Sequence, residues 1–226
     1  MMNVRKRIIG GKNILLCGDE TPEILLLQPV DDHDASMLES EAAYISEHCE
    51  RKFLLCGIKV DNWFTELSPW EANAVFGENA FGSGAGETLA YMTGALLPAL
   101  ENEFGISQSI QRVIGGYSLA GLFALWSGYQ TDVFGAVAAA SPSVWFPEWI
   151  DYAKKHKMLA RAVSLSLGDR EEKTRNPVMA KVGKCIREQY EILNDDVSVK
   201  VTLNINEGNH FKEPDVRTAK AFLEVI

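Results

Sequence analysis

The sequence lacks several features that would place a chain of 226 residues in a special class. No apolar run approaches the roughly 20 residues that a membrane-spanning helix needs, so we expect no membrane association. Internal repeats and low-complexity segments are missing, and the eight prolines are scattered rather than gathered into a linker. The length lies below the roughly 250–300 residues at which single cores stop growing. We therefore predict one globular domain over residues 1–226.

Basic residues are too few to balance the acidic ones. The chain has 22 Lys and Arg against 31 Asp and Glu, a net charge of −9 and a pI near 5.0. Nucleic acids and anionic membranes are bound through a basic footprint, so this charge balance argues against both as partners. It also disfavours strongly anionic substrates, unless local charges oppose the overall sign. The basic residues near the N-terminus resemble the start of a signal peptide, but Gly10 and Gly11 interrupt the apolar stretch that should follow. We therefore expect a cytoplasmic protein.

The four cysteines are not arranged for metal or disulfide chemistry. Cys17, Cys49, Cys56 and Cys185 show no C-x-x-C spacing, and buried free thiols are the expected state. The glycine-rich segment at 82–86 lacks the Lys-Ser/Thr pair of a phosphate-binding loop and follows no strand. The sequence thus predicts no metal and no cofactor.

Short apolar runs alternate with helical patterns along the chain. The predicted strands lie at 14–17, 24–29, 53–58, 111–116, 134–140, 162–167 and 197–203, and the predicted helices at 34–49, 87–104, 119–129, 179–193 and 216–225. This alternation indicates a mostly parallel sheet covered by helices on both faces, and burial on both faces explains why most strands are continuous apolar runs. Pro98 predicts a kink in its helix.

The segment GYSLAG at 116–121 joins a predicted strand directly to a predicted helix. In a nucleophile elbow the strand turns sharply into a helix, the serine lies at the tight point, and small residues flank it to avoid collisions. Gly116 stands two residues before Ser118, and Ala120 replaces the glycine usually found two residues after it. The pattern predicts that Ser118 is a catalytic nucleophile. The alternative is a glycine-bounded turn between strand and helix in which the serine has no catalytic role.

A serine hydroxyl needs a base to take its proton, and in this arrangement the chain order is Ser, acid, His. Only His156 and His210 follow Ser118. His156 lies in KKHK, which is typical of a solvated surface, whereas His210 lies in a glycine-containing loop after the last predicted strand. His210 is therefore the predicted base.

The acid that orients His210 should lie in the loop after the strand at 162–167. Asp169, Glu171 and Glu172 are all available there, and reach from the strand end does not choose among them. The oxyanion needs backbone donors, of which the amide of Leu119 is one. The second should come from the end of the strand at 53–57, where we expect Ile58, with Lys59 as the alternative.

Aromatic residues gather in loops predicted at the carboxyl ends of strands, the rim where open α/β sheets bind ligands. They are Trp63, Trp70, Phe81, Tyr117, Trp145, Phe146 and Trp149. We expect Tyr117, Trp145 and Trp63 to bind substrate, which would favour an apolar or aromatic acyl or alcohol group. Ordinary packing is the alternative explanation for each of them.

Four segments together resemble the putative-esterase family of α/β-hydrolases, the group of enterochelin esterase and esterase D. WFTELSP at 63–69 is similar to the family's R-x-x-E-L-T-P, GYSLAG to its G-x-S-x-G-G, SPSVW at 141–145 to its S-x-S-x-W, and GDRE at 168–171 to its G-x-x-[DE]. His210 lies in a G-x-H-type loop. Ala120 departs from the pattern, and Trp63 stands where the family has Arg, which bears on substrate contacts more than on the triad.

The resemblance implies an α/β-hydrolase fold without a separate lid domain, and it favours Glu171 as the acid, ahead of Glu172 and Asp169. It further implies a serine hydrolase that cleaves a small-molecule carboxylic ester through an acyl-enzyme. A thioesterase such as S-formylglutathione hydrolase, an amidase with the same triad, and a non-catalytic binding domain are the alternatives. The sequence leaves the oligomeric state open.

Overall fold

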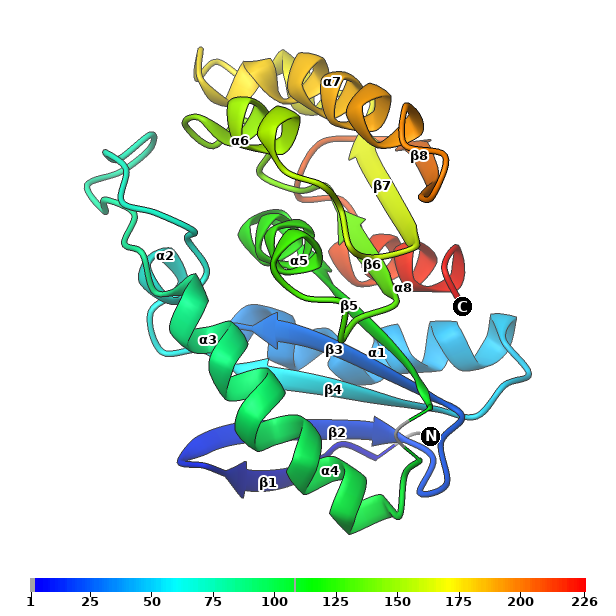
Figure 1. The fold of residues 1–226 in the computed structure, drawn as a ribbon. Helices are drawn as coiled ribbons and strands as arrows, with labels where there is room; N and C mark the ends of the chain where they lie inside the picture. The colour runs from blue at the N-terminus through cyan, green and yellow to red at the C-terminus, as the bar shows by residue number, and fades with distance from the viewer. Residues whose placement is uncertain (1–2, 108) are drawn as a thin grey trace.

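An eight-stranded sheet organises the computed structural model, which describes residues 3–107 and 109–226 (Figure 1). Its strands are β1 (Arg5–Ile9), β2 (Lys12–Gly18), β3 (Ile24–Val30), β4 (Phe53–Lys59), β5 (Gln111–Tyr117), β6 (Ala136–Ala140), β7 (Ala162–Gly168) and β8 (Lys200–Asn206). The spatial order is β1-β2-β4-β3-β5-β6-β7-β8. The pairs β1–β2 and β2–β4 are antiparallel, and every other pair is parallel. The predicted mostly parallel sheet is confirmed.

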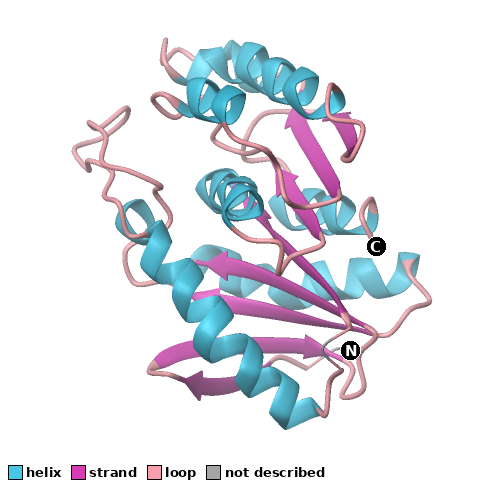
Figure 2. Ribbon diagram, in the orientation of Figure 1, coloured by secondary structure: helices cyan, strands magenta, loops and turns pink. Residues whose placement is uncertain are grey.

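Helices cover both faces of this sheet (Figure 2). They are α1 (Asp32–His48), α2 (Trp63–Glu66), α3 (Ala85–Tyr91), α4 (Leu97–Phe104), α5 (Ser118–Gln130), α6 (Trp149–Lys155), α7 (Val182–Asn194) and α8 (Pro214–Leu223). α1 and α8 enclose one hydrophobic core, and α3 to α7 enclose the other. Within the described ranges, no helix has the length and apolar character that crossing a bilayer requires.

Burial on both faces explains the continuous apolar strands. Every residue of β3 and of β6 is buried, so both strands are apolar except at Gln28 of β3, whose amide donates to a buried carboxyl group. The helix α5 is buried along almost its whole length, from Leu119 to Tyr129. The two central strands β3 and β5 and the helix α5 therefore form a rigid base for the end of β5, where Ser118 lies.

Four elements differ from the sequence-based prediction. β8 begins at Lys200 rather than at 197, because Asp196 accepts hydrogen bonds from the amide and hydroxyl of Ser198, which makes a turn and leaves Val197 fully exposed. β1 was not predicted, since its three central residues are exposed and give no apolar pattern. α2 and α6 lie where the sequence predicted no helix.

The helix predicted over 87–104 is interrupted, as Pro98 suggested. α3 leads into the π-helical turn η1 (Met92–Leu96), and α4 follows with Pro98 in its first turn. Proline has no N–H to donate, and in a first helical turn that donor has no partner in any case. The chain thus passes from α3 to the proline-containing start of α4 through a widened π turn.

A buried carboxyl group lies between α1 and the sheet. Glu41 is 3% exposed, and one of its oxygens accepts a hydrogen bond from Gln28 Nε2 at 2.7 Å. The other oxygen has no partner among the described residues. Burial raises the pKa of Glu41 to about 8; the bond from Gln28 opposes the rise, and Asp34 and Asp215 add to it.

We expect Glu41→Gln to stabilise the protein progressively as the pH rises. The folded chain keeps Glu41 protonated up to its pKa of about 8, whereas the ordinary carboxyl of the unfolded chain ionises above 4.5. Between these values ionisation opposes folding by about 1.4 kcal/mol per pH unit, and the amide removes this penalty. Urea unfolding at several pH values measures the gain, with the exposed Glu39→Gln as control. A pH-independent difference from wild type would contradict the prediction.

Candidate functional site

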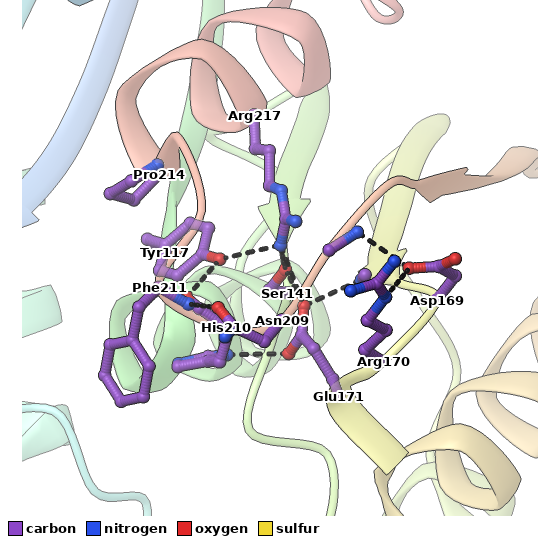
Figure 3. Close-up of polar contacts among 12 residues, drawn as sticks. Tyr117, Ser141, Asp169, Arg170, Glu171, Asn209, His210, Phe211, Pro214 and Arg217 are labelled. Carbon is purple, nitrogen blue, oxygen red and sulfur yellow. Dashed lines mark hydrogen bonds and ion pairs between the residues drawn. The ribbon is translucent and has the colours of Figure 1, made fainter. Parts of the chain in front are cut away.

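Four neighbouring strands each end beside one residue of the site. Ser118 directly follows β5, Ser141 follows β6, Glu171 lies just after β7, and His210 lies in the loop after β8. Because β5 to β8 are adjacent and parallel, their carboxyl ends meet at one edge of the sheet. Residues 93 positions apart in sequence, Tyr117 and His210, thus come into hydrogen-bond contact (Figure 3).

The turn that carries Ser118 has the geometry of a nucleophile elbow. Ser118 adopts a left-handed backbone with φ of 55°, and Gly116 has φ of 155°. A Cβ on Gly116 would lie 2.6 Å from the Cβ of Ala120, so the position two residues before the serine must be glycine. Ala120 fits in place of the family's glycine because Gly116 leaves room for its methyl group.

The side chains of Ser118, His210 and Glu171 form a continuous hydrogen-bonded line. His210 Nε2 lies 3.0 Å from Ser118 Oγ, and His210 Nδ1 lies 2.6 Å from Glu171 Oε2. A proton on Nδ1 and a lone pair on Nε2 is the tautomer that satisfies both contacts. In that form the ring can accept the serine proton, and the carboxylate fixes its orientation.

The second oxygen of Glu171 is held by three donors. Oε1 accepts hydrogen bonds from the amide of Gly168 at 2.7 Å, from Ser141 Oγ at 2.7 Å, and from the Arg217 guanidinium at 3.0 Å. Burial works to raise the pKa of Glu171, but the hydrogen bonds from His210, Ser141 and Gly168 and the charge of His210 outweigh it and hold that pKa below its usual value. Glu171 is therefore an ionised, fixed carboxylate.

A buried arginine on α8 connects the acid to the histidine loop. Arg217 is 3% exposed, and its guanidinium also donates to Tyr117 Oη at 3.2 Å and to the Glu207 carbonyl at 2.9 Å. Tyr117 Oη in turn donates to the His210 carbonyl at 2.8 Å. Burial, with the nearby charge of Glu171, raises the pKa of Tyr117 to about 12, so its hydroxyl remains a donor. Figure 3 shows this chain of contacts.

The other acid candidates and His156 lie apart from this line. Asp169 Oδ1 accepts from the Gly208 amide at 2.7 Å, which ties the end of β7 to the histidine loop. Glu172 pairs with Arg187 at 2.8 Å. His156 lies exposed at the end of α6 and stacks on Tyr152. Of the three carboxylates in the loop after β7, Glu171 is the one in contact with His210.

The two predicted oxyanion donors lie in different places. Leu119 lies in the first turn of α5, whose amides have no carbonyl one turn earlier in the helix and lie at its positive end. Ile58 lies inside β4, fully buried and paired with Ile14 and Pro29, and β3 separates it from β5. The structure therefore brings Leu119, but not Ile58, next to Ser118.

The predicted substrate residues also separate. Trp145 lines a cavity of about 330 Å³ beside His210, together with Met179, Val182 and Phe211. Tyr117 is engaged with Arg217 and the histidine loop, so its ring supports the base, 5.1 Å from the imidazole centre. Trp63 begins α2 and is not among the residues that form the cavity wall.

Sequence reasoning missed three polar residues at the site. Ser141 bonds to Glu171, and the Ser143 amide donates to the Ser118 carbonyl at 3.0 Å while its hydroxyl lies 3.3 Å from Ser118 Oγ. Both serines belong to the SPSVW segment, which was noted without a role. Arg217 gave no signal, because an arginine in a terminal amphipathic helix usually lies in solvent.

Among the described residues, no three or more His, Cys, Asp or Glu side chains are grouped to hold an ion, and Cys17, Cys49, Cys56 and Cys185 are free thiols.

Comparison with known proteins gives a family match and a fold match. A family model described as putative esterase matches residues 22–208, and no curated protein matches the sequence. Siderophore hydrolase EstA from Aspergillus nidulans is 17% identical, with a TM-score of 0.74 over 98% of this chain and 93% of that one. An IroE-like serine hydrolase from Shewanella oneidensis is 14% identical, with a TM-score of 0.73 over 99% and 80%. The enterobactin and salmochelin hydrolase IroE is 17% identical, with a TM-score of 0.65 over 98% and 93%. These likenesses confirm the predicted α/β-hydrolase fold.

Proposed function

Because the chain belongs to the putative esterase family and is a carboxylic ester hydrolase, we propose that it cleaves its substrate with a Ser118–His210–Glu171 triad through an acyl-enzyme. One observation carries this proposal. His210 lies 3.0 Å from the serine oxygen through Nε2 and 2.6 Å from Glu171 through Nδ1, so each nitrogen has the partner that its role requires.

Acylation begins when Ser118 Oγ attacks the ester carbonyl. His210 Nε2 takes the hydroxyl proton as the new C–O bond forms, and Glu171 stabilises the resulting imidazolium without becoming protonated. The tetrahedral oxyanion is stabilised by the amide of Leu119 at the positive end of α5. When the intermediate collapses, the C–O bond to the alcohol breaks, and His210 delivers its proton to the leaving oxygen.

Deacylation repeats these steps with water. His210 takes a proton from a water molecule that attacks the acyl carbon, and the new intermediate expels Ser118, which takes the proton back from His210. The acid product then leaves. The hydrogen bonds of Glu171 to Ser141, Gly168 and Arg217 support this cycle, because the carboxylate need not move or desolvate between steps.

The similar proteins support small-molecule esters as the substrate class of this chain. The similar structures include a siderophore hydrolase and an enterobactin and salmochelin hydrolase. An amide or thioester substrate would use the same triad with a different leaving atom. A panel of 4-nitrophenyl esters, thioesters and anilides therefore belongs to any test of the proposal, and turnover confined to anilides would contradict the esterase assignment.

Labelling by a fluorophosphonate tests the nucleophile directly. We expect intact-protein mass spectrometry to show one adduct, which peptide mapping assigns to Ser118, because only a serine paired with a base reacts readily. His210→Ala should abolish rapid labelling. His156→Ala, at the exposed end of α6, is the matched histidine control and should label like wild type. An adduct on another serine, or labelling unchanged in His210→Ala, would refute the triad.

A further inference from the structure

A positively charged cavity lies beside the triad on the side of His210. Its volume is about 330 Å³, and Arg170, Lys173 and Arg175 form the wall contributed by the loop between β7 and α7. His210 and Phe211 also line this cavity. This volume lies at the lower end of the roughly 300–1,000 Å³ that small-molecule sites occupy.

The charge of this cavity opposes that of the whole chain. The chain carries 31 acidic and 22 basic residues, yet the cavity wall has three cations and one acid, Glu171. That acid already bonds to His210 and Arg217, so its charge does not neutralise the cavity. Among the described residues, Lys173 and Arg175 form no ion pair.

Acids close in sequence to these cations have partners of their own. Glu172 pairs with Arg187 at 2.8 Å. Asp169 accepts from the Gly208 amide at 2.7 Å, and among the described residues its one ion pair with a cavity cation is a 4.0 Å contact with Arg170. The cavity therefore presents a net positive charge toward any ligand that enters it.

The rest of the cavity is apolar. Trp145, Met179 and Val182 form part of its wall, and Phe211 is 85% exposed although it lies next to the proposed base. Exposed large apolar side chains at the wall of a cavity are typical of ligand contacts. A ligand that fits both parts has a flat apolar body and an anionic end.

The position of His210 decides which part of the ester lies here. The base delivers its proton to the leaving oxygen, so the alcohol part must lie against the imidazole. The cavity wall includes His210 and its neighbours Asn209 and Phe211, whereas Ser118 and Leu119, which hold the carbonyl carbon and oxygen, are not part of it.

We propose that this cavity binds the leaving alcohol of the substrate, and that this alcohol is an apolar or aromatic group bearing a carboxylate. The carboxylate pairs with Lys173, Arg175 and Arg170, and the ring packs between Trp145 and Phe211. The inference rests on the proposed triad, since it takes its orientation from proton delivery by His210.

Two matched acetate esters test it. Hydrolysis of 4-acetoxybenzoate releases an anionic phenol, whereas methyl 4-acetoxybenzoate has the same skeleton without the charge. After each kcat/KM is divided by the rate of hydroxide hydrolysis, we expect a preference of about tenfold for the anionic ester at low salt, since exposed charge pairs contribute about two- to fivefold each. The preference should fall to about twofold in about 0.5 M NaCl.

Neutral substitutions then assign the preference to the cavity. In the triple variant Arg170→Gln, Lys173→Gln, Arg175→Gln the ratio of the two esters should approach one. The control removes the same charge elsewhere: Lys154→Gln, Lys155→Gln and Lys157→Gln lie at the end of α6, outside the cavity wall. This control should keep the tenfold ratio, which excludes a mere effect of net charge.

An acyl-side pair checks the orientation. For 4-nitrophenyl hydrogen suberate and its methyl ester, the charge lies on the acid part, and we expect a ratio near one. A preference found only in this pair, equal rates for the two acetates in the wild type, or a preference that survives the triple substitution would each overturn the inference. Failure of the triad looks different: no ester would turn over, and Ser118 would not react with the fluorophosphonate.

Discussion

Ser118→Ala is expected to lower kcat for ester hydrolysis by about 10⁴- to 10⁶-fold, the range found when a triad member is removed. The Ser118 oxygen is the only atom in the line from Glu171 that can form the acyl bond, and alanine at 118 leaves the base with nothing to activate. Hydrolysis of 4-nitrophenyl acetate, followed at enzyme concentrations high enough to measure a residual rate, gives the ratio.

The double variant Ser118→Ala, His210→Ala makes the test sharper. If the two side chains act as one unit, the double variant is no slower than the worse single variant, because the second deletion removes nothing that still functions. His156→Ala should keep wild-type turnover. A double variant whose loss in kcat equals the product of the two single losses would contradict a shared role. So would a single variant that keeps more than about one per cent of the wild-type rate.

Arg217→Met is the second change with a large expected effect. The buried guanidinium donates hydrogen bonds to the Glu171 carboxylate, to the Tyr117 hydroxyl oxygen and to the Glu207 carbonyl. Methionine cannot donate, so each of these three oxygens loses one hydrogen bond. Breaking a buried ion pair costs about 3–5 kcal/mol, and we expect the free energy of unfolding to fall by about 3 kcal/mol. Urea unfolding at neutral pH measures it.

The pH profile separates a positioning role from a purely structural one. Without the Arg217 cation that donates to its Oε1 at 3.0 Å, Glu171 should take up a proton more readily, so the acid limb of kcat/KM should move to higher pH, and kcat should fall by about tenfold. The loss in free energy of unfolding caused by Arg217→Met should be greatest above pH 4.5, the pKa of an ordinary Glu in the unfolded chain. The loss should become smaller as the pH falls below that value.

The matched control for this variant is Arg112→Met. Arg112 is a partly buried arginine paired with Glu101, away from the site. It should lose stability without any change in the acid limb. If Arg217→Met is destabilised but keeps the wild-type profile, Arg217 has no positioning role in the reaction.

The parts of the site that follow from local sequence were predictable, and those that depend on distant contacts were not. Ser118 lies in a turn whose small neighbours and flanking elements identify it within six residues. His210 followed from chain order. The choice of Glu171 needed the family resemblance, because Asp169 and Glu172 have the same reach, and their contacts with Gly208 and Arg187 become visible only in the folded chain.

Arg217 and Ile58 illustrate the limit in opposite ways. Arg217 is a poor candidate by composition, and what makes it important is contact with residues 46 and 100 positions away. Ile58 was a reasonable candidate by position, but β4 continues through Lys59, so the end of the strand lies later than the apolar run suggested. The start of β8 was misplaced for a related reason, since an alternating pattern also runs through the turn at Asp196–Ser198.

The position of β8 has a consequence for how the protein fails under stress. β8 is one of the two edge strands and, within the described residues, pairs with β7 alone, whereas β5 is held between β3 and β6. An edge strand with exposed residues separates from a sheet at lower free energy than a central one. Opening of that edge would withdraw His210 while Ser118 stays in place. Warming or mild denaturant would then abolish activity through a partial, reversible opening. The protein would be active over a narrower range of temperature and denaturant concentration than the range over which the rest of the sheet remains folded.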